Sequence, residues 1–280
     1  MKILAVGNSF SGNATKFLRE IVNSAGGCRL VFGHASIGGC PLEKHYKLAM
    51  KHERNPQDPE GMPYTHKNRK MGLKEMLVAE KWQYVTIQQY SMHSFRIETY
   101  RPWAKRLCNY IKKYAPQAEI VFHQTWAYRA DDKVIYNKSF TPKKMYRDLT
   151  DAYHAITSEL GIKGIIPVGD AFQLATESPE WKFMPDRKFN PKKPVFPKLP
   201  NELHSLHAGY RWGEKDGIRL LGFDSHHANI AGEFLGGCVW FEFFFGKDVR
   251  KIKFKPEQIS RKDAEFLKAI AHTALQDKVS

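Results

Sequence analysis

The stretch "MKILAVGNSFSGNATKFL", residues 1–18, decides the fold. Residues 2–6 are apolar and typical of a buried strand, Gly7 ends the run, and apolar residues then recur at helical spacing over 14–26. A strand, a glycine turn and a helix in direct succession form the first part of a βαβ unit. Ser9 on that turn fits either a helix cap or a displayed nucleophile, so the rest of the chain must decide.

The same alternation repeats along the chain. It predicts further strands at 28–36, 84–89, 119–126 and 163–172, and helices at 71–80, 101–115, 143–161 and 228–245, the last being the final helix. Because parallel strands need crossover connections, this pattern is typical of a mostly parallel sheet with helices on both faces. We therefore predict a three-layer α/β/α sandwich with a five-stranded sheet in the order 2-1-3-4-5. Residues 1–280 are interpreted as a single domain with long loops at about 51–70 and 179–220.

The chain is strongly basic. Its 44 Lys and Arg outnumber 29 Asp and Glu, for a formal net charge of +15. Such a balance favours attraction to polyanions, including nucleic acids, acidic glycans and anionic membrane surfaces. Because the basic residues are spread along the chain and no nucleic-acid-binding motif accompanies them, nucleic acid is not the expected partner. The basic stretch 179–220 could supply a cationic rim for an acidic glycan.

Neither a membrane span nor a metal site is indicated. The longest apolar stretch, residues 228–246, contains Asn229, Glu233 and Glu242, so a core helix fits better than a transmembrane segment. The four cysteines show no CxxC and no zinc-ligand spacing, which leaves any disulfide open. The apolar run at 2–6 is too short for a signal peptide, and the compartment stays open.

Polar and small residues follow the carboxyl ends of the predicted strands, where ligands bind in sheets of this kind. They are Ser9 after the first strand, Gly38 and Gly39 after the second, Gln88 and Gln89 after the third, Trp126 and Tyr128 after the fourth, and Gly169 and Asp170 after the fifth. Asp224, His226 and His227 stand just before the last helix. A serine at one end and an Asp-x-x-His at the other are the parts of an acyl-transfer site.

Acyl transfer to a serine needs a base and a carboxylate that orients it. A serine hydroxyl is a weak nucleophile until a histidine accepts its proton, and the carboxylate fixes the tautomer of that histidine. The three-residue spacing lets Asp224 accept from the Nδ1–H of His227 while Nε2 faces the site. The oxyanion that develops on the substrate needs converging N–H donors, which the Ser9 backbone, a glycine and a side-chain amide would supply.

These segments resemble the SGNH (GDSL-like) hydrolase superfamily, and within it a bacterial subgroup similar to carbohydrate esterases. Gly7-Asn8-Ser9 matches the first block, "ASIGGCPLEKH" at 35–45 the second, and Asp224-Ser225-His226-His227 the last. The resemblance implies the flavodoxin-like SGNH hydrolase fold, with Ser9 as nucleophile, His227 rather than His226 as base, and Asp224 as its partner. It also implies Gly39 as an oxyanion donor, and an ester hydrolase that needs no metal or organic cofactor.

The third block departs from the superfamily pattern. The superfamily has Gly-x-Asn-Asp, whose asparagine donates to the oxyanion, whereas this chain has Gln88-Gln89-Tyr90-Ser91. Some carbohydrate esterases of the superfamily have a Gln-Gly-Glu stretch there, so Gln88 is the expected substitute amide and Gln89 the second choice. Gln89 is also expected to bind substrate, and Trp126 and Tyr128 either to pack in the core or to bind substrate, with Trp126 as a wall for a sugar ring.

The expected substrate is an O-acyl ester, above all an O-acetyl group on a carbohydrate. Two alternatives stay open: a lipase- or arylesterase-type hydrolase of the same superfamily, and a non-catalytic glycan-binding protein that keeps the fold. The polar and basic loops at 51–70 and 179–220 argue against the extended apolar cleft of a lipase. Similarity to exported carbohydrate esterases favours a periplasmic or secreted location, with the cytoplasm not excluded, and the oligomeric state is left open.

Overall fold

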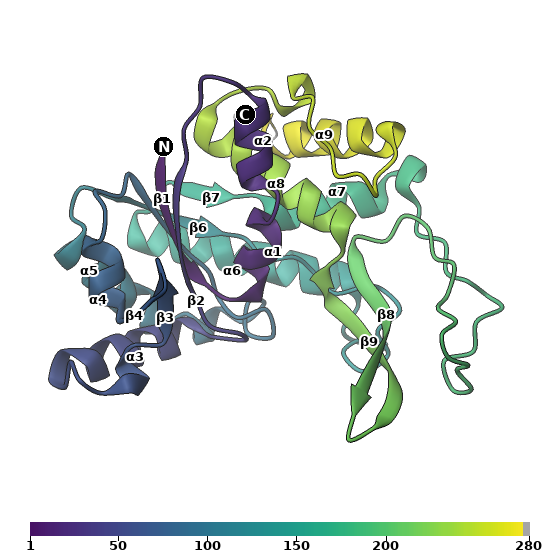
Figure 1. The fold of residues 1–280 in the computed structure, drawn as a ribbon, viewed down its shortest axis with the longest axis horizontal. Coiled ribbons are helices and arrows are strands. Elements are labelled where there is room, and N and C mark those ends of the chain that lie inside the picture. The colour runs from purple at the N-terminus through teal and green to yellow at the C-terminus, as the bar shows by residue number, and fades with distance from the viewer. Residues whose placement is uncertain (277–280) are drawn as a thin grey trace.

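A five-stranded parallel sheet forms the centre of the computed structural model, which describes residues 1–276 (Figure 1). Its strands are β1 (Lys2–Gly7), β2 (Val31–Ser36), β5 (Tyr84–Ile87), β6 (Glu119–His123) and β7 (Gly164–Ile166). They lie in the order β2-β1-β5-β6-β7, so the predicted α/β architecture and the predicted strand order are confirmed. The register pairs Gly7 with Ser36 and Val6 with Ile87, which brings the carboxyl ends of β1, β2 and β5 together.

Helices pack around this sheet in two groups. The first group, in mutual contact through α8, contains α1 (Ser9–Thr15), α2 (Leu18–Ser24), α7 (Val168–Glu177), α8 (Ile230–Phe245) and α9 (Arg261–Gln276). The second contains α3 (Leu42–Arg54), α4 (Leu73–Val78) and α5 (Trp103–Tyr114), and α6 (Pro142–Leu160) precedes β7. Single 3₁₀ turns are at Pro59–Gly61, Ile97–Thr99, Pro179–Trp181 and Val249–Lys251. None of the helices within residues 1–276 is both long and apolar enough to span a bilayer.

The turn from β1 to α1 needs glycine at its first position. A Cβ at Gly7 would lie 2.7 Å from Ser11 Oγ and 3.0 Å from the side chain of Gln88, so glycine is required there. Asn8 then caps α1, because its Oδ1 accepts the backbone N–H of Phe10 at 3.1 Å. Ser9 is consequently the first residue of the helix, directly above the carboxyl end of β1.

Several predicted boundaries were wrong. The strand predicted at 163–172 ends at Ile166, because Pro167 lacks an N–H for the ladder, and Gly169 and Asp170 lie in the first turn of α7. The helix predicted from residue 14 is divided at Lys16 and Phe17 into α1 and α2. Further along, α9 follows the helix that was predicted to be the last.

The two predicted loops contain regular structure. Residues 51–70 include the end of α3 and most of a small hairpin, formed by β3 (Tyr64–His66) and β4 (Arg69–Met71). Residues 179–220 begin as irregular chain but continue into the antiparallel strands β8 (His207–Lys215) and β9 (Ile218–Ala228). Asp216 and Gly217 join β8 to β9, both at positive φ (53° and 74°), as a two-residue hairpin turn requires.

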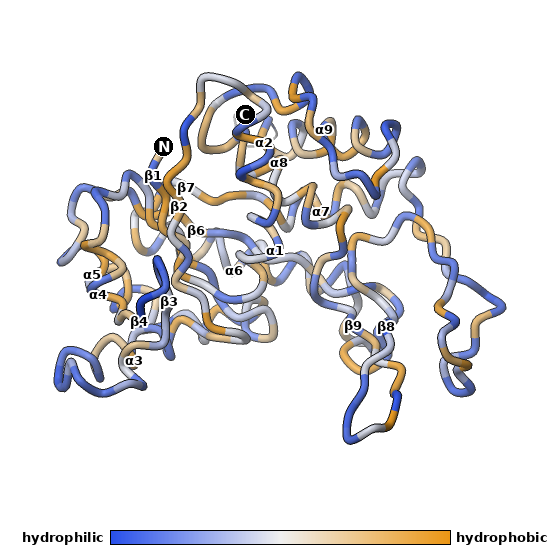
Figure 2. The backbone as a smooth tube through the Cα atoms, in the orientation of Figure 1, coloured by the Kyte–Doolittle hydropathy of each residue, from blue (hydrophilic) through white to orange (hydrophobic). Residues whose placement is uncertain are grey.

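The β8–β9 hairpin projects from the body of the molecule, next to the irregular segment that precedes it (Figure 1). Its far end is exposed, whereas Asp224, Ser225 and Ala228 near its base are buried. Apolar colour follows the sheet strands β1 and β7 and returns in patches along this projecting hairpin (Figure 2). The hairpin therefore combines an exposed tip with a base that is anchored in the core.

Candidate active site

The structure brings together the serine, histidine and aspartate that the sequence singled out. Ser9 Oγ lies 2.8 Å from His227 Nε2, and His227 Nδ1 lies 2.9 Å from Asp224 Oδ2. Because a carboxylate can only accept, His227 Nδ1 carries the proton and Nε2 accepts from the Ser9 hydroxyl. Ser9 and His227 are 218 residues apart in the chain and meet where α1 faces the base of β9.

Asp224 is held as a carboxylate. Its Oδ1 accepts the backbone N–H groups of His227 at 3.0 Å and His226 at 3.4 Å, while Oδ2 accepts from the His227 ring. Burial works to raise the pKa of Asp224, but the hydrogen bonds from His227 and the nearby imidazoles outweigh it and leave the pKa below its usual value. Asp224 is therefore ionised at neutral pH, and its negative charge can orient the His227 ring.

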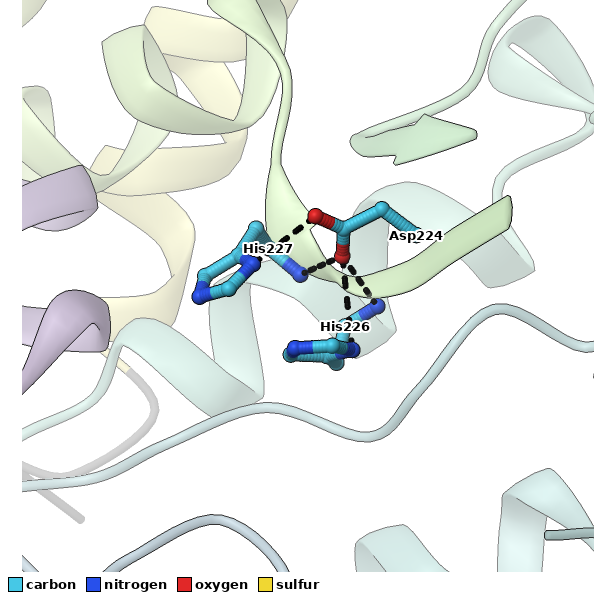
Figure 3. A group of neighbouring side chains, drawn as sticks. All are labelled: Asp224, His226 and His227. Carbon is cyan, nitrogen blue, oxygen red and sulfur yellow. Dashed lines mark hydrogen bonds and ion pairs between the residues drawn. The ribbon is translucent and has the colours of Figure 1, made fainter. Parts of the chain in front are cut away.

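His226 lies beside His227 and contacts the other oxygen of the same carboxylate (Figure 3). Its Nδ1 is 3.3 Å from Asp224 Oδ1, and its ring centre is 4.2 Å from that of His227 and 5.3 Å from that of Tyr128. Burial lowers the pKa of His226, with Asp224 opposing that shift. No hydrogen bond joins His226 to Ser9 within the part of the chain that the structure describes, so His227 is the histidine in place to act as base.

Buried hydrogen bonds fix the backbone of β9 around the two histidines. The Trp126 Nε1–H donates to the His226 carbonyl at 2.9 Å, and the Arg129 N–H donates to the Ser225 carbonyl at 2.8 Å. The Ala228 N–H donates to Asn13 Oδ1 at 3.2 Å, which joins β9 directly to α1. The position of the histidine relative to Ser9 is thus set by contacts to two neighbouring segments.

Trp126 does not form a wall for a sugar ring. The residue is fully buried, and its ring is stacked between Phe10 at 4.3 Å and Phe172 at 4.4 Å, so neither face is free. Tyr128 is also buried, and its hydroxyl shares a 2.8 Å hydrogen bond with Ser91 Oγ. Both residues predicted to bind substrate therefore contact His226 instead, Tyr128 through its ring and Trp126 through its Nε1–H.

Arg129 joins three segments at the base of the hairpin. Its guanidinium makes paired hydrogen bonds of 2.6–2.7 Å to Asp131 and to Glu202, and its side chain is 3% exposed. The rings of Phe183, Tyr210 and Phe223 lie within 4.8–5.7 Å of the guanidinium carbon. Arg129 therefore clamps the chain after β6, the irregular segment and the hairpin to one another.

The two backbone N–H groups predicted to receive an oxyanion, those of Ser9 and Gly39, have no hydrogen-bond partner among residues 1–276. Ser9 is the first residue of α1, so its N–H has no partner within the helix, and Asn8 caps the N–H of Phe10 instead. Gly39 lies in the exposed turn after β2 at φ +59°, and Asn8 Nδ2 donates to the Cys40 carbonyl of the same turn at 3.1 Å.

The side-chain amides predicted to complete this set are occupied. Gln88 is 1% exposed; its Nε2 donates to Asn8 Oδ1 at 2.6 Å and its Oε1 is 2.7 Å from His123 Nδ1. Gln89 is fully buried, and its Nε2 donates to the Thr99 carbonyl at 2.9 Å. These contacts favour a supporting role for both glutamines, and the oxyanion role of Gln88 stays a prediction.

Asn8 and His123 are the supporting residues that the sequence did not single out. Because Gln88 Nε2 donates to Asn8, its Oε1 must accept, and His123 Nδ1 must carry a proton. Burial lowers the pKa of His123 to about 3, which keeps the ring neutral. A polar residue in an apolar strand, such as His123 at the end of β6, is the signal that could have indicated this network.

Two groups of residues within 1–276 have the ligand types of a metal site. The first is Asp224, His226 and His227, and the second is Glu242, Asp248 and His272. In the first group both His227 nitrogens and both carboxylate oxygens already take part in the hydrogen bonds described above. A metal bound there would have to displace either the hydrogen bond between His227 Nδ1 and Asp224 or the contact between His227 Nε2 and Ser9, so the geometry suits proton transfer better.

A family model matches residues 2–183 and 214–274 of the chain, and its description is "Domain of unknown function (DUF4886)". The chain belongs to the DUF4886 family. A solved structure from the same family is the crystal structure of a DUF4886 family protein from Bacteroides uniformis. It is 27% identical to this chain and has a TM-score of 0.75, and the match covers 100% of this chain and 96% of that one. No curated protein matches the chain.

Two further solved structures show the same fold at lower identity. A candidate SGNH hydrolase from Slackia heliotrinireducens is 18% identical with a TM-score of 0.51, over 87% of this DUF4886 chain and 98% of that chain. A candidate GDSL-like lipase from Parabacteroides merdae is 14% identical with a TM-score of 0.50, over 88% and 96% respectively. The SGNH-like fold implied by the sequence resemblance is thereby confirmed.

Proposed function

We propose that this DUF4886 protein is a serine esterase that removes an O-acetyl group from a carbohydrate. The observation that carries the proposal is the continuous relay from Ser9 Oγ to His227 Nε2 at 2.8 Å and from His227 Nδ1 to Asp224 Oδ2 at 2.9 Å. The same relay activates serine for acyl transfer on unrelated folds, and its role is recognised by this geometry.

The reaction follows from the positions of these atoms. Ser9 Oγ attacks the ester carbonyl carbon while its proton passes to His227 Nε2, and Asp224 stabilises the imidazolium that forms. The carbonyl electron pair moves to oxygen, which the N–H groups of Ser9 and Gly39 receive. Collapse of the intermediate releases the sugar hydroxyl, which takes its proton from His227. Water then attacks the acyl-serine by the same route and releases acetate.

Packing next to Ser9 favours a small acyl group. Asn8, Phe10, Gln88 and Trp126 are each no more than 2% exposed, so the space beside the nucleophile is filled by the protein itself. A long acyl chain would need an apolar channel leading away from the serine. Acetyl, with a single carbon beyond the carbonyl, needs none.

The groups around the site favour an ester substrate whose alcohol part is polar. His226 is partly exposed beside the base, with 39% of its side chain accessible, and Arg211 lies 3.7 Å from Asp224. Polar and charged side chains of this kind bind hydroxyl-rich substrates through hydrogen bonds. This reasoning, together with the resemblance to carbohydrate esterases, is the basis for choosing a sugar ester.

Turnover of 4-nitrophenyl acetate and release of acetate from an acetylated oligosaccharide test the proposal. The wild type should hydrolyse both, Ser9→Ala should lose at least about a thousandfold in rate, and His227→Ala should lose much more than His226→Ala. Activity that survives in Ser9→Ala would exclude Ser9 as nucleophile. Equal losses in the two histidine variants would exclude His227 as the base.

A further inference from the structure

The β8–β9 hairpin that carries His227 has two different faces. In an antiparallel ladder, directly paired residues point to the same face, and successive residues along a strand alternate between faces. The register pairs Arg211 with Gly222, Gly213 with Leu220, and Lys215 with Ile218. These six residues therefore share one face, which we call the Arg211 face.

The opposite face is covered by the irregular segment before the hairpin. The ring of Tyr210 packs against Phe189 at 5.2 Å, and Trp212 packs against Phe196 at 5.5 Å. The Trp212 Nε1–H also donates to the Lys198 carbonyl at 3.0 Å. This face is thus occupied by the chain itself and is not available to a ligand.

The Arg211 face is open. A Cβ added at Gly213 would meet no atom within 4 Å, and one at Gly222 would meet only the Arg211 carbonyl, at 3.7 Å. The two glycines leave a hollow of about 210 Å³, lined by Arg211, Gly213, Glu214, Lys215, Leu220 and Gly222. Leu220 is 54% exposed, so the hollow offers an apolar surface between two basic side chains. Glu214 at its edge is 3.8 Å from Arg219.

Arg211 connects this hollow to the catalytic residues. Its Nη2 lies 3.7 Å from Asp224 Oδ2, and its side chain is 72% exposed, so most of its donors are free for a ligand. From Asp224 to Ile218 the strand covers about 20 Å at roughly 3.3 Å per residue. A chain lying along this strip would reach from the hairpin tip to Ser9.

We propose that the Arg211 face binds the anionic backbone of an acidic polysaccharide and presents its acetyl ester to Ser9. This inference rests on the proposed esterase function and names its substrate class. The Arg guanidinium matches a carboxylate in geometry as well as in charge, and Lys215 adds a second cation further along the strip. Bare glycine backbone lets a polymer lie close, and the net charge of +15 attracts a polyanion from solution.

The first experiment compares acetate release from acetylated polygalacturonate and from an acetylated neutral xylo-oligosaccharide. The wild type should show a higher kcat/KM on the acidic substrate, and the advantage should shrink as salt rises from about 50 to 500 mM, because screening weakens exposed ion pairs. Arg211→Gln should lower the acidic-to-neutral ratio of kcat/KM about tenfold. The matched control Arg219→Gln, on the covered face, should leave that ratio unchanged.

A second variant tests the hollow itself. Gly213→Val places a side chain in open space on a strand that favours valine, so the fold should persist while the strip is blocked. Acetate release from acetylated polygalacturonate should fall with little change for 4-nitrophenyl acetate. Equal activity of Gly213→Val and wild type on the acidic polymer would overturn the proposal.

Failure of the esterase function would be distinguishable from failure of this inference. Affinity electrophoresis of the Ser9→Ala protein in gels containing unacetylated polygalacturonate measures binding without catalysis. Retardation that Arg211→Gln abolishes would support the Arg211 face even if no acetate were released from any substrate. Hydrolysis of both acetylated substrates with no preference for the acidic one, and no retardation, would leave the esterase intact and overturn the inference.

Discussion

The turn that carries Ser9 and the hairpin that carries His227 are built in opposite ways. The Ser9 turn lies at the carboxyl end of the sheet, where Asn8, Gln88 and His123 form a fully buried chain of hydrogen bonds. The hairpin leaves the body of the protein, and only its base is buried, through contacts to Trp126, Arg129 and Asn13. Ser9 is thus placed by the core, and His227 by a few separable contacts.

This difference means that stability and activity can be separated in one half of the site but not in the other. Changes beneath Ser9 should unfold the protein before they reveal a catalytic role. Changes at the hairpin base should misplace His227 while the sheet stays folded. Four variants or conditions probe that contrast, beginning with the one expected to have the largest effect.

Asp224→Asn should lower kcat by about 10⁴-fold, because an amide no longer selects the His227 tautomer whose Nε2 accepts from Ser9. Its unfolding midpoint in urea should stay near that of the wild type, since the hairpin lies outside the sheet. Steady-state kinetics on 4-nitrophenyl acetate measure the first quantity, and circular dichroism the second. A loss of less than tenfold would show that the carboxylate does not orient the base.

Arg129→Met should cost about 3 kcal/mol locally, because Asp131 and Glu202 lose the cation that neutralises them. Hydrogen exchange should speed up in β9 and remain slow in β1, and kcat should fall more than KM rises. Arg129→Lys, which keeps the charge but not the paired geometry, should be intermediate. Uniformly faster exchange in both strands would remove the distinction between the two regions.

Gln88→Leu should destabilise the fold by about 2 kcal/mol, since the buried Nδ1–H of His123 loses its acceptor. If Gln88 only supports Asn8, kcat should stay within tenfold of the wild type when measured well below the unfolding temperature. A fall of 100-fold or more with unchanged urea stability would instead restore Gln88 as an oxyanion donor. This variant therefore decides the prediction that the sequence left open.

Acidification should weaken the core beneath Ser9. Burial lowers the pKa of His45 to about 4, and the ring contacts Tyr64 Oη at 2.8 Å and the Gly7 carbonyl at 3.0 Å. The folded-state pKa is below the unfolded value near 6.5, so the contribution of neutral His45 is complete above pH 6.5 and is lost as pH falls toward 4. The slope is about 1.4 kcal/mol per pH unit for each such histidine. In His45→Gln, the free energy of unfolding measured in urea should fall less steeply between pH 6.5 and 4 than in the wild type. An identical dependence on pH would exclude His45 as a contributor.

The sequence could predict the sheet but not the hairpin base. Apolar runs of strand length, separated by helical periodicity, indicate β1, β2, β5 and β6 because burial on both faces requires such runs. The Asp216-Gly217 pair between two alternating stretches also indicated a hairpin, and this local signal was overlooked. α9 was not predicted, because the helix at 228–245 was expected to be the last one.

Side-chain roles were harder to predict than elements. Asp224 and His227 could be paired from their spacing alone, because three residues fix their relation locally. Gln88 and Trp126 could not be placed, since each owes its orientation to residues far away in sequence, such as Asn8 and His226. Residue type suggested a sugar wall at Trp126, whereas tertiary packing buries that ring; Gln88 is buried as well, and its role as an amide donor stays a prediction.

The long separation between Ser9 and His227 has a consequence for biosynthesis. Chains grow from the N-terminus at about 5–20 residues per second, so the 218 residues between nucleophile and base take roughly 10–40 seconds to add. During that interval the Ser9 turn can fold on β1 and β5, but its serine has no base. The proposed hydrolytic centre is therefore incomplete on the ribosome until the hairpin has been synthesised and packs against the sheet.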